Sequence, residues 1–343
     1  MTVQIDFNTD YSFSIADLKK DRVLVPQLEA AGFDGVCMPE TPNDPFPALS
    51  IAAYESSTLA LRTGIAVAFS RSPMTMAYAA HELNVLAEGR FTLGLGAQIK
   101  PHIVRRFSMP WHGAAAQMED YLLALRAICR SWYRDEPLDY AGKFYNFNLM
   151  PPDFRPRDIQ LGPPKIVLAA VGPQMIKLAA RHADGIVVHP FSTESYLHDY
   201  LIPLVEKERS GSGRSGEFEI SLSPFLVCAD NQQSFDRELE DVRQKIAFYG
   251  STPAYKRVLD FHDLGDLHDE LHRLSRAGRW ADMGKLIDDD VMGLFACMGG
   301  EAEVPTLVSR RFNNKVNHTS LTSSHCDESL CDRLLRFQSA LSP

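Results

Sequence analysis

The sequence lacks the features that mark secreted, membrane-spanning and nucleic-acid-binding proteins. Its first residues, MTVQIDFNTDYSFS, contain no basic start followed by an apolar run, so we expect no signal peptide and a cytoplasmic location. No stretch approaches the roughly 18 apolar residues that cross a bilayer, so we expect no membrane span. Lys and Arg number 35 against 44 Asp and Glu, and the net charge of −9 argues against nucleic acid as the main partner.

Cysteine is also scarce. The chain has six cysteines, far apart and without the spacing of a disulfide-stabilised fold, and most lie within apolar runs where a free buried thiol is the usual state. Cys326 and Cys331 follow His325 but lack a second pair of ligands. We therefore expect free thiols and no metal site.

The chain does contain a regular alternation of short apolar runs and longer amphipathic segments. The expected strands occupy residues 3–7, 35–38, 64–69, 90–96, 165–170, 185–189 and 218–227. Repeated strand–helix–strand units imply parallel strands joined by right-handed crossovers. No Gly-x-Gly-x-x-Gly opens a helix after the first strand, which argues against a Rossmann domain. The pattern predicts an α/β fold, a (β/α)8 TIM barrel formed by residues 1–343 as a single domain.

Two regions depart from this rhythm. Residues from about 250 to 290 are charged and irregular in pattern, and we interpret them as an insertion in the barrel. Residues from about 313 to 343 form a divergent C-terminal segment, in which we expect the last barrel strand at 316–321 and a closing helix at 328–341.

Three longer segments, in this order, resemble the luciferase-like (bacterial-luciferase-like) flavin and deazaflavin oxidoreductases. They are AAGFDGVCMPE (30–40), LRTGIAVAFSRSPMTMAYAAHELNVLAEGRFTLGLGAQ (61–98) and KIVLAAVGPQMIKLAARHADGIVVHPF (165–191). Three shorter ones, RRFSMPW (105–111), IAFYGSTPAYKRVL (246–259) and LIDDDVMGLFACMGG (286–300), are similar to the branch that depends on coenzyme F420. The resemblance covers about residues 1–312.

The resemblance implies an enzyme that transfers a hydride between coenzyme F420 and a small organic substrate, in a homodimer or larger homo-oligomer. An FMNH2-dependent two-component monooxygenase needs the same ring-binding site. A non-catalytic flavin-binding protein would also retain that site. The sequence leaves both alternatives open, and the substrate is not readable from it.

In a TIM barrel the reaction site lies at the C-terminal ends of the strands. Those ends give the following predicted cofactor-binding residues: Asp6, Asn8, Glu40, Ala66, Val67, Ala68, Gly96, Gln98, Ala170, Val171, Gly172, Pro173 and His189. The small residues among them allow the backbone to approach a flat ring. The turn at residues 171–173 opens a helix, whose unpaired amides attract the cofactor phosphate.

The resemblance also implies roles for particular residues. Glu40 matches an acidic residue at the end of the second strand and is predicted to be catalytic through a polar contact to the ring. His102 is the second predicted catalytic residue, a proton shuttle, at a position where a related sugar-phosphate dehydrogenase has Asn. Ser192 stands where that enzyme has a phosphate-binding lysine, so we do not expect a phosphorylated sugar as substrate. The family's third strand carries a bulge with a non-proline cis peptide, which corresponds here to Ala66-Val67.

Overall fold

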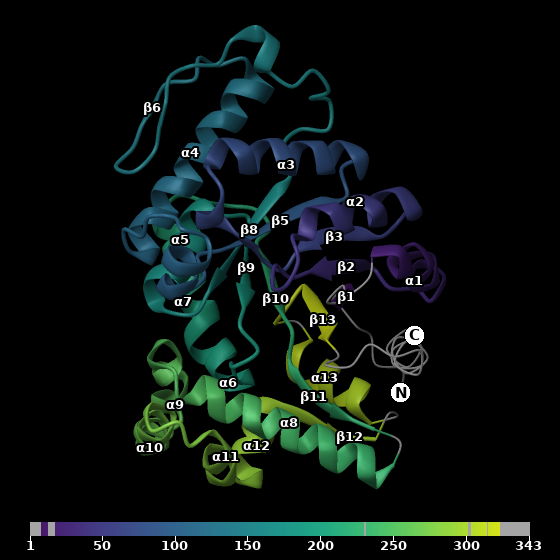
Figure 1. The fold of residues 1–343 in the computed structure, drawn as a ribbon, viewed down its shortest axis with the longest axis vertical. Coiled ribbons are helices and arrows are strands. Elements are labelled where there is room, and N and C mark those ends of the chain that lie inside the picture. The colour runs from purple at the N-terminus through teal and green to yellow at the C-terminus, as the bar shows by residue number, and fades with distance from the viewer. Residues whose placement is uncertain (1–7, 13–17, 230, 301–302, 314, 323–343) are drawn as a thin grey trace.

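The computed structural model describes residues 8–12, 18–229, 231–300, 303–313 and 315–322 (Figure 1). The predicted strand at 3–7, the predicted helix at 328–341, Asp6 and the two C-terminal cysteines lie outside these ranges. Among the helices of the described ranges, none is both long and apolar enough to span a membrane.

Parallel strands close into a barrel, which confirms the predicted fold class. In order around the barrel the strands are β1 (Asn8–Ser12), β2 (Gly35–Met38), β3 (Ala60–Thr63), β5 (Phe91–Gly96), β8 (Lys165–Ala170), β9 (Gly185–Val188), β10 (Glu219–Leu222) and β13 (His318–Thr322). β13 pairs with β1 and completes the ring, and the short β4 (Ala66–Val67) continues β3 along β5. Closure leaves the barrel without an unpaired edge.

Helices cover the outside of the barrel (Figure 1). They are α1 (Leu18–Ala30), α2 (Pro45–Glu55), α3 (Pro73–Leu86), α4 (Ala114–Arg134), α5 (Pro173–His182), α7 (Ile202–Gly211) and α13 (Val304–Phe312). Local sequence explains several starts: Asp44 and Ser72 cap α2 and α3 by accepting hydrogen bonds from Phe46 N and Thr75 N, and a proline follows each cap. The main apolar core lies between these helices and the strands.

A second group of elements follows β10 and lies below the barrel in Figure 1. It contains β11 (Phe225–Cys228), α8 (Gln232–Gly250), α9 (Lys256–Phe261), α10 (Gly265–Arg276), α11 (Trp280–Met283), α12 (Asp289–Phe295) and β12 (Ala296–Gly299). β11 and β12 pair in parallel, and the group has an apolar core of its own. Residues 250–290 are thus largely helical; their status as an insertion stays a prediction.

The remaining elements are short. They are β6 (Tyr140–Ala141), β7 (Asn146–Phe147), α6 (Glu194–Tyr196), the π-helices η2 (His102–Arg106) and η4 (Leu197–Leu201), and the 3-10 turns η1 (Ala68–Ser70), η3 (Pro152–Phe154), η5 (Pro253–Tyr255) and η6 (Gly284–Leu286).

Three expected strands need correction. The third barrel strand begins earlier than expected, at Ala60, and of the expected range 64–69 only Ala66–Val67 is a strand. The single strand expected at 218–227 is divided into β10 and β11, because Pro224 between them has no N–H to donate to a sheet. Asn8 begins β1 instead of following a strand, so its predicted position at a C-terminal strand end was wrong. The last strand, β13, overlaps the expected residues 316–321.

Contacts across the barrel identify the side chains that point inward. Arg62 of β3 forms an ion pair with Glu219 of β10 and donates to Nδ1 of His318 of β13 at 3.0 Å. Because other strands separate β3 from β10 and β13, these contacts cross the interior. Paired residues of parallel strands point to the same side and side chains alternate along a strand. The inward positions that follow from this register include Cys37, Thr92, Gly94, Gly96, Val167, Ala169, Gly185, Val187 and Ser221.

Candidate functional site

At the C-terminal end of the barrel, several inward residues of the β3, β5, β8 and β9 side are small or aliphatic, and some are partly exposed. Ala169 and Val187 face inward and are partly exposed, whereas the inward Val167 one layer below is buried. Ile65 is partly exposed as well and lies over Gly96, where an added Cβ would be only 2.6 Å from Ile65 Cδ1. On this side, the upper interior wall therefore presents small and aliphatic groups. We call this wall, formed by Ile65, Gly96, Ala169 and Val187, the barrel mouth.

A bulge separates β3 from β4 beside the mouth. Arg62 pairs with Thr92 and Ala66 with Leu95, so three residues of one strand face two of the other. The structure thus confirms the predicted bulge. The non-proline cis peptide lies within it, at Gly64-Ile65, so the prediction of Ala66-Val67 was wrong by two residues.

Thr63 and Gly94 hold the bulge against β5. Thr63 Oγ1 donates to Gly94 O at 2.7 Å and accepts from Gly94 N at 2.9 Å, replacing the ladder bonds that the bulge interrupts. A Cβ on Gly94 would lie 2.0 Å from Thr63 O, so this approach requires glycine.

Six of the predicted cofactor-binding residues are buried, namely Glu40, Ala66, Val67, Ala68, Gly96 and Ala170. Ala66, Val67 and Ala68 are 0% exposed, and Ala170 is 3% exposed because its side chain points outward to the helices. Gly96 lies beneath Ile65. Their roles as cofactor contacts stay predictions, and the partly exposed neighbours Ile65 and Ala169 are the residues that reach the mouth.

Glu40, at the end of β2, is buried and tied to the segment that follows the bulge. Its Oε2 accepts from Val67 N at 2.8 Å and from Arg71 Nη1 at 2.7 Å, and Arg71 Nη2 donates to Asp44 at 2.6 Å. Burial alone would lower the pKa of Arg71, but the hydrogen bonds to both carboxylates raise it, so the guanidinium stays charged. These are the contacts of a positioning residue, and the predicted catalytic role of Glu40 stays a prediction.

His102 and Gln98 lie on the rim that follows β5. His102 is exposed on η2, and Arg106 of the same turn donates to Thr41 O at 2.6 Å, which joins η2 to the loop after β2. Gln98 has a φ of 57° and its Oε1 accepts from Ile99 N. The proton-shuttle role of His102 stays a prediction.

The start of α5 opens into a pocket of about 560 Å³. Gly172 precedes Pro173 without a side-chain cap, so amides of the first turn are available to an anion. The opposite wall carries Arg257 and Lys256, of which Lys256 is paired with Asp269 at 2.7 Å, and Asp260 also lines the pocket. Arg257 lies 5.7 Å over the ring of Tyr200 and donates to its hydroxyl at 3.4 Å. The part of the pocket between Arg257 and the start of α5 therefore suits an anionic group.

The sequence did not identify Lys256 and Arg257, because nothing in a local pattern brings α9 to the start of α5. Three basic residues that follow barrel strands have partners of their own. Arg71 binds Glu40, Arg106 binds Thr41 O, and Lys177 lies 3.5 Å from Glu208.

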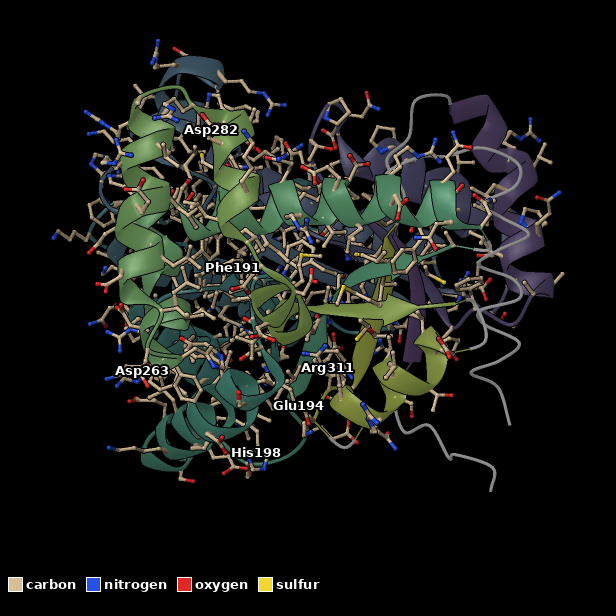
Figure 2. The ribbon with its side chains drawn as sticks, turned by 90° about the horizontal axis from the view of Figure 1, so that it is seen from below. Phe191, Glu194, His198, Asp263, Asp282 and Arg311 are labelled. Carbon is tan, nitrogen blue, oxygen red and sulfur yellow. The ribbon has the colours of Figure 1, made fainter. Side chains whose placement is uncertain are left out.

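A second pocket, of about 390 Å³, lies between α6 and α13. Glu194 and Arg311 approach each other there (Figure 2), 3.9 Å apart, and Lys315 Nζ lies 2.6 Å from Glu194 Oε1. Because a carboxylate already neutralises these cations, we do not assign an anion to this pocket. Within the described residues, no three or more His, Cys, Asp or Glu side chains are grouped so as to hold a metal ion.

His189 directly follows β9 and is partly exposed. Its ring packs against Tyr249 of α8 and Tyr255 of η5, with centroids 4.4 and 4.6 Å away. Burial lowers its pKa to about 4, so the imidazole is neutral near pH 7. His189 is a predicted cofactor contact with a polar side chain. It follows the inward-facing residues Gly185 and Val187 of β9 in the same alternation.

Comparisons with known proteins agree with this arrangement. The sequence profile of the family described as luciferase-like monooxygenase matches residues 5–313. The uncharacterised protein Rv1360 of Mycobacterium tuberculosis is 42% identical over 273 residues, covering 79% of this chain and 80% of the relative. A 5,10-methylenetetrahydromethanopterin reductase of Archaeoglobus fulgidus is 25% identical over 293 residues, 82% of each protein. The solved structure of a coenzyme F420-dependent tetrahydromethanopterin reductase from Methanopyrus kandleri matches 97% of each chain with a TM-score of 0.77 and 18% identity.

Proposed function

The chain belongs to the luciferase-like monooxygenase family, and we propose that it is an oxidoreductase that transfers a hydride between coenzyme F420 and a small organic substrate. The Archaeoglobus relative is a reductase by name, and the solved Methanopyrus reductase is described as F420-dependent. These descriptions favour a deazaflavin over FMN in this proposal.

The observation that carries the proposal is the partly exposed apolar mouth beside the bulge. A flat tricyclic ring needs a wall without protruding polar groups, and Ile65, Ala169 and Val187 supply one. The charged tail of such a cofactor needs cations, and the pocket at the start of α5 supplies Arg257 and backbone amides. Both requirements are met at the same end of the barrel.

When bound, the cofactor supplies a two-electron hydride carrier. The side chains of the mouth would orient the ring and exclude water from it. Glu40 and Arg71 would keep the backbone after the bulge in place. Reduction of a carbonyl also consumes a proton, and His102, exposed on the rim, is the proposed group to deliver it.

A binding and turnover assay tests the proposal. F420 and FMN would be titrated separately into the protein, and F420 oxidation or reduction would then be followed with a panel of alcohols and carbonyl compounds. We expect saturable F420 binding and turnover of at least one compound class. Binding of FMN with no response to F420 would contradict the proposal.

A two-component monooxygenase is the second candidate, favoured by the family's description. It would bind FMNH2 from a separate reductase and consume oxygen with substrate. A non-catalytic flavin-binding protein would bind cofactor without turnover of any kind. Oxygen uptake in the presence of a flavin reductase separates the three functions. A homo-oligomeric state and a cytoplasmic location stay predictions.

A further inference from the structure

The contacts of His189 fix which of its ring nitrogens carries a proton. The backbone N–H of Phe191 donates to Nδ1 at 3.0 Å, so Nδ1 must be the unprotonated nitrogen. A neutral imidazole with an accepting Nδ1 carries its hydrogen on Nε2. His189 therefore has its N–H on the side of the ring away from Phe191 N.

The surroundings hold this orientation. Phe191, labelled in Figure 2, is buried. Its ring stacks on Phe295 with centroids 4.4 Å apart, so the donor to Nδ1 is anchored in the second core. Tyr249 and Tyr255 pack against the imidazole from α8 and η5. They are the titratable groups in ring contact with it, and burial raises the pKa of both, so neither is charged near neutral pH.

We propose that His189 is a specificity-determining residue that presents Nε2–H as a fixed hydrogen-bond donor to a carbonyl oxygen bound at the barrel mouth. The inference rests on the proposed function, because that oxygen belongs to the cofactor ring or to the substrate. The alternation of β9, continued by one residue beyond Val188, puts His189 on the same side as Val187, and its side chain is partly exposed. His189 would favour ligands that carry a hydrogen-bond acceptor at this position, and it would not transfer a proton to them.

Two substitutions separate this role from packing. His189→Phe keeps an aromatic ring but has no donor, whereas His189→Gln retains an N–H. We expect His189→Phe to weaken the binding of the molecule that carries this oxygen, cofactor or substrate, about tenfold. We expect His189→Gln to lose less affinity than His189→Phe. If His189→Phe binds the cofactor more weakly in the absence of substrate, the oxygen belongs to the cofactor ring. If its cofactor affinity is unchanged and its KM for the substrate is raised, the oxygen belongs to the substrate. His198→Gln, a change at an exposed histidine, is the control.

Nitrogen NMR of the histidine rings provides a readout that needs no ligand. In the wild type we expect an Nε2–H tautomer for His189 that does not change between pH 5.5 and 8. A protonated or Nδ1–H ring would overturn the proposal. So would unchanged cofactor affinity and KM in folded His189→Phe and His189→Gln. If the wild type binds neither F420 nor FMN, the proposed function fails and the inference fails with it, whereas failure of the variants alone leaves the proposed function intact.

Discussion

The carboxylate of Glu40 accepts a hydrogen bond from the backbone N–H of Val67 at 2.8 Å, and thereby joins the end of β2 to the strand after the bulge. A side chain chosen from the sequence as a ring contact thus holds the backbone beside the mouth. The same oxygen binds Arg71, so one carboxylate determines the position of both.

Glu40→Ala is expected to lower the free energy of unfolding by about 2–4 kcal/mol, because it leaves a buried amide and a half-buried guanidinium without their acceptor. Urea denaturation measures the change. Glu55→Ala, which breaks the exposed ion pair with Arg22, is the matched control and should cost no more than about 1 kcal/mol. Equal midpoints for the two variants would contradict this account of Glu40.

Gly94→Ala is expected to destabilise the protein by about 1–3 kcal/mol and to weaken cofactor binding, because the added Cβ collides with the backbone of the bulge at Thr63 O. Gly293→Ala in α12 is the control, since nothing lies within 4 Å of its Cβ position and alanine favours a helix. Thermal unfolding and a cofactor titration of both variants test the prediction. A Gly94→Ala protein as stable as Gly293→Ala would show that the bulge tolerates a side chain.

Arg257→Ala is expected to raise the Kd for a phosphorylated cofactor about tenfold at low salt and to leave stability unchanged, because Arg257 is exposed and faces the start of α5. The loss should diminish at high salt and should be absent for a cofactor analogue without the phosphate. Lys285→Ala, at an exposed lysine of η6, is the control. An equal loss of affinity for the dephosphorylated analogue would contradict a phosphate site at Arg257.

Stability is expected to fall with acidity through the window between pH 6.5 and about 4. The pKa of His189 is lowered from 6.5 to about 4 by burial, so in this window the unfolded chain binds a proton that the folded chain does not. The contribution is fully present above pH 6.5 and amounts to about 2–3 kcal/mol. Burial lowers the pKa of His81, His182 and His262 in the same direction, so the measurement is the difference between wild type and His189→Phe. If the difference in urea midpoint between wild type and His189→Phe stays constant from pH 7 to 5, the lowered pKa of His189 is contradicted.

Much of the fold could be predicted because its signals are local. The apolar runs at 35–38, 90–96, 165–170 and 185–189 each became a barrel strand, since buried parallel strands need continuous apolar sequence. The expected strand at 218–227 is interrupted at Pro224. The sequence shows that proline has no N–H, but the apolar residues on both sides still favoured a single strand.

The site was less predictable, because it depends on register and on distant contacts. The family pattern indicated a cis peptide in the third strand, yet the small residues from Gly64 to Ala68 offer little to fix its position within two residues. Whether Ala169 or Ala170 faces the mouth depends on pairing with Val187 and Val188. Arg257 reaches the start of α5 from a segment some 80 residues later in the chain.

The measurement that most directly tests the central claim is an F420 titration of a variant with a filled mouth. Val187→Trp places a large ring on the partly exposed inner wall, whereas Leu286→Trp, on the exposed η6, adds the same side chain outside it. We predict that Val187→Trp stays folded and loses F420 binding at least tenfold, while Leu286→Trp binds as the wild type does. A folded Val187→Trp protein with wild-type F420 affinity would contradict the claim that the ring lies in the barrel mouth.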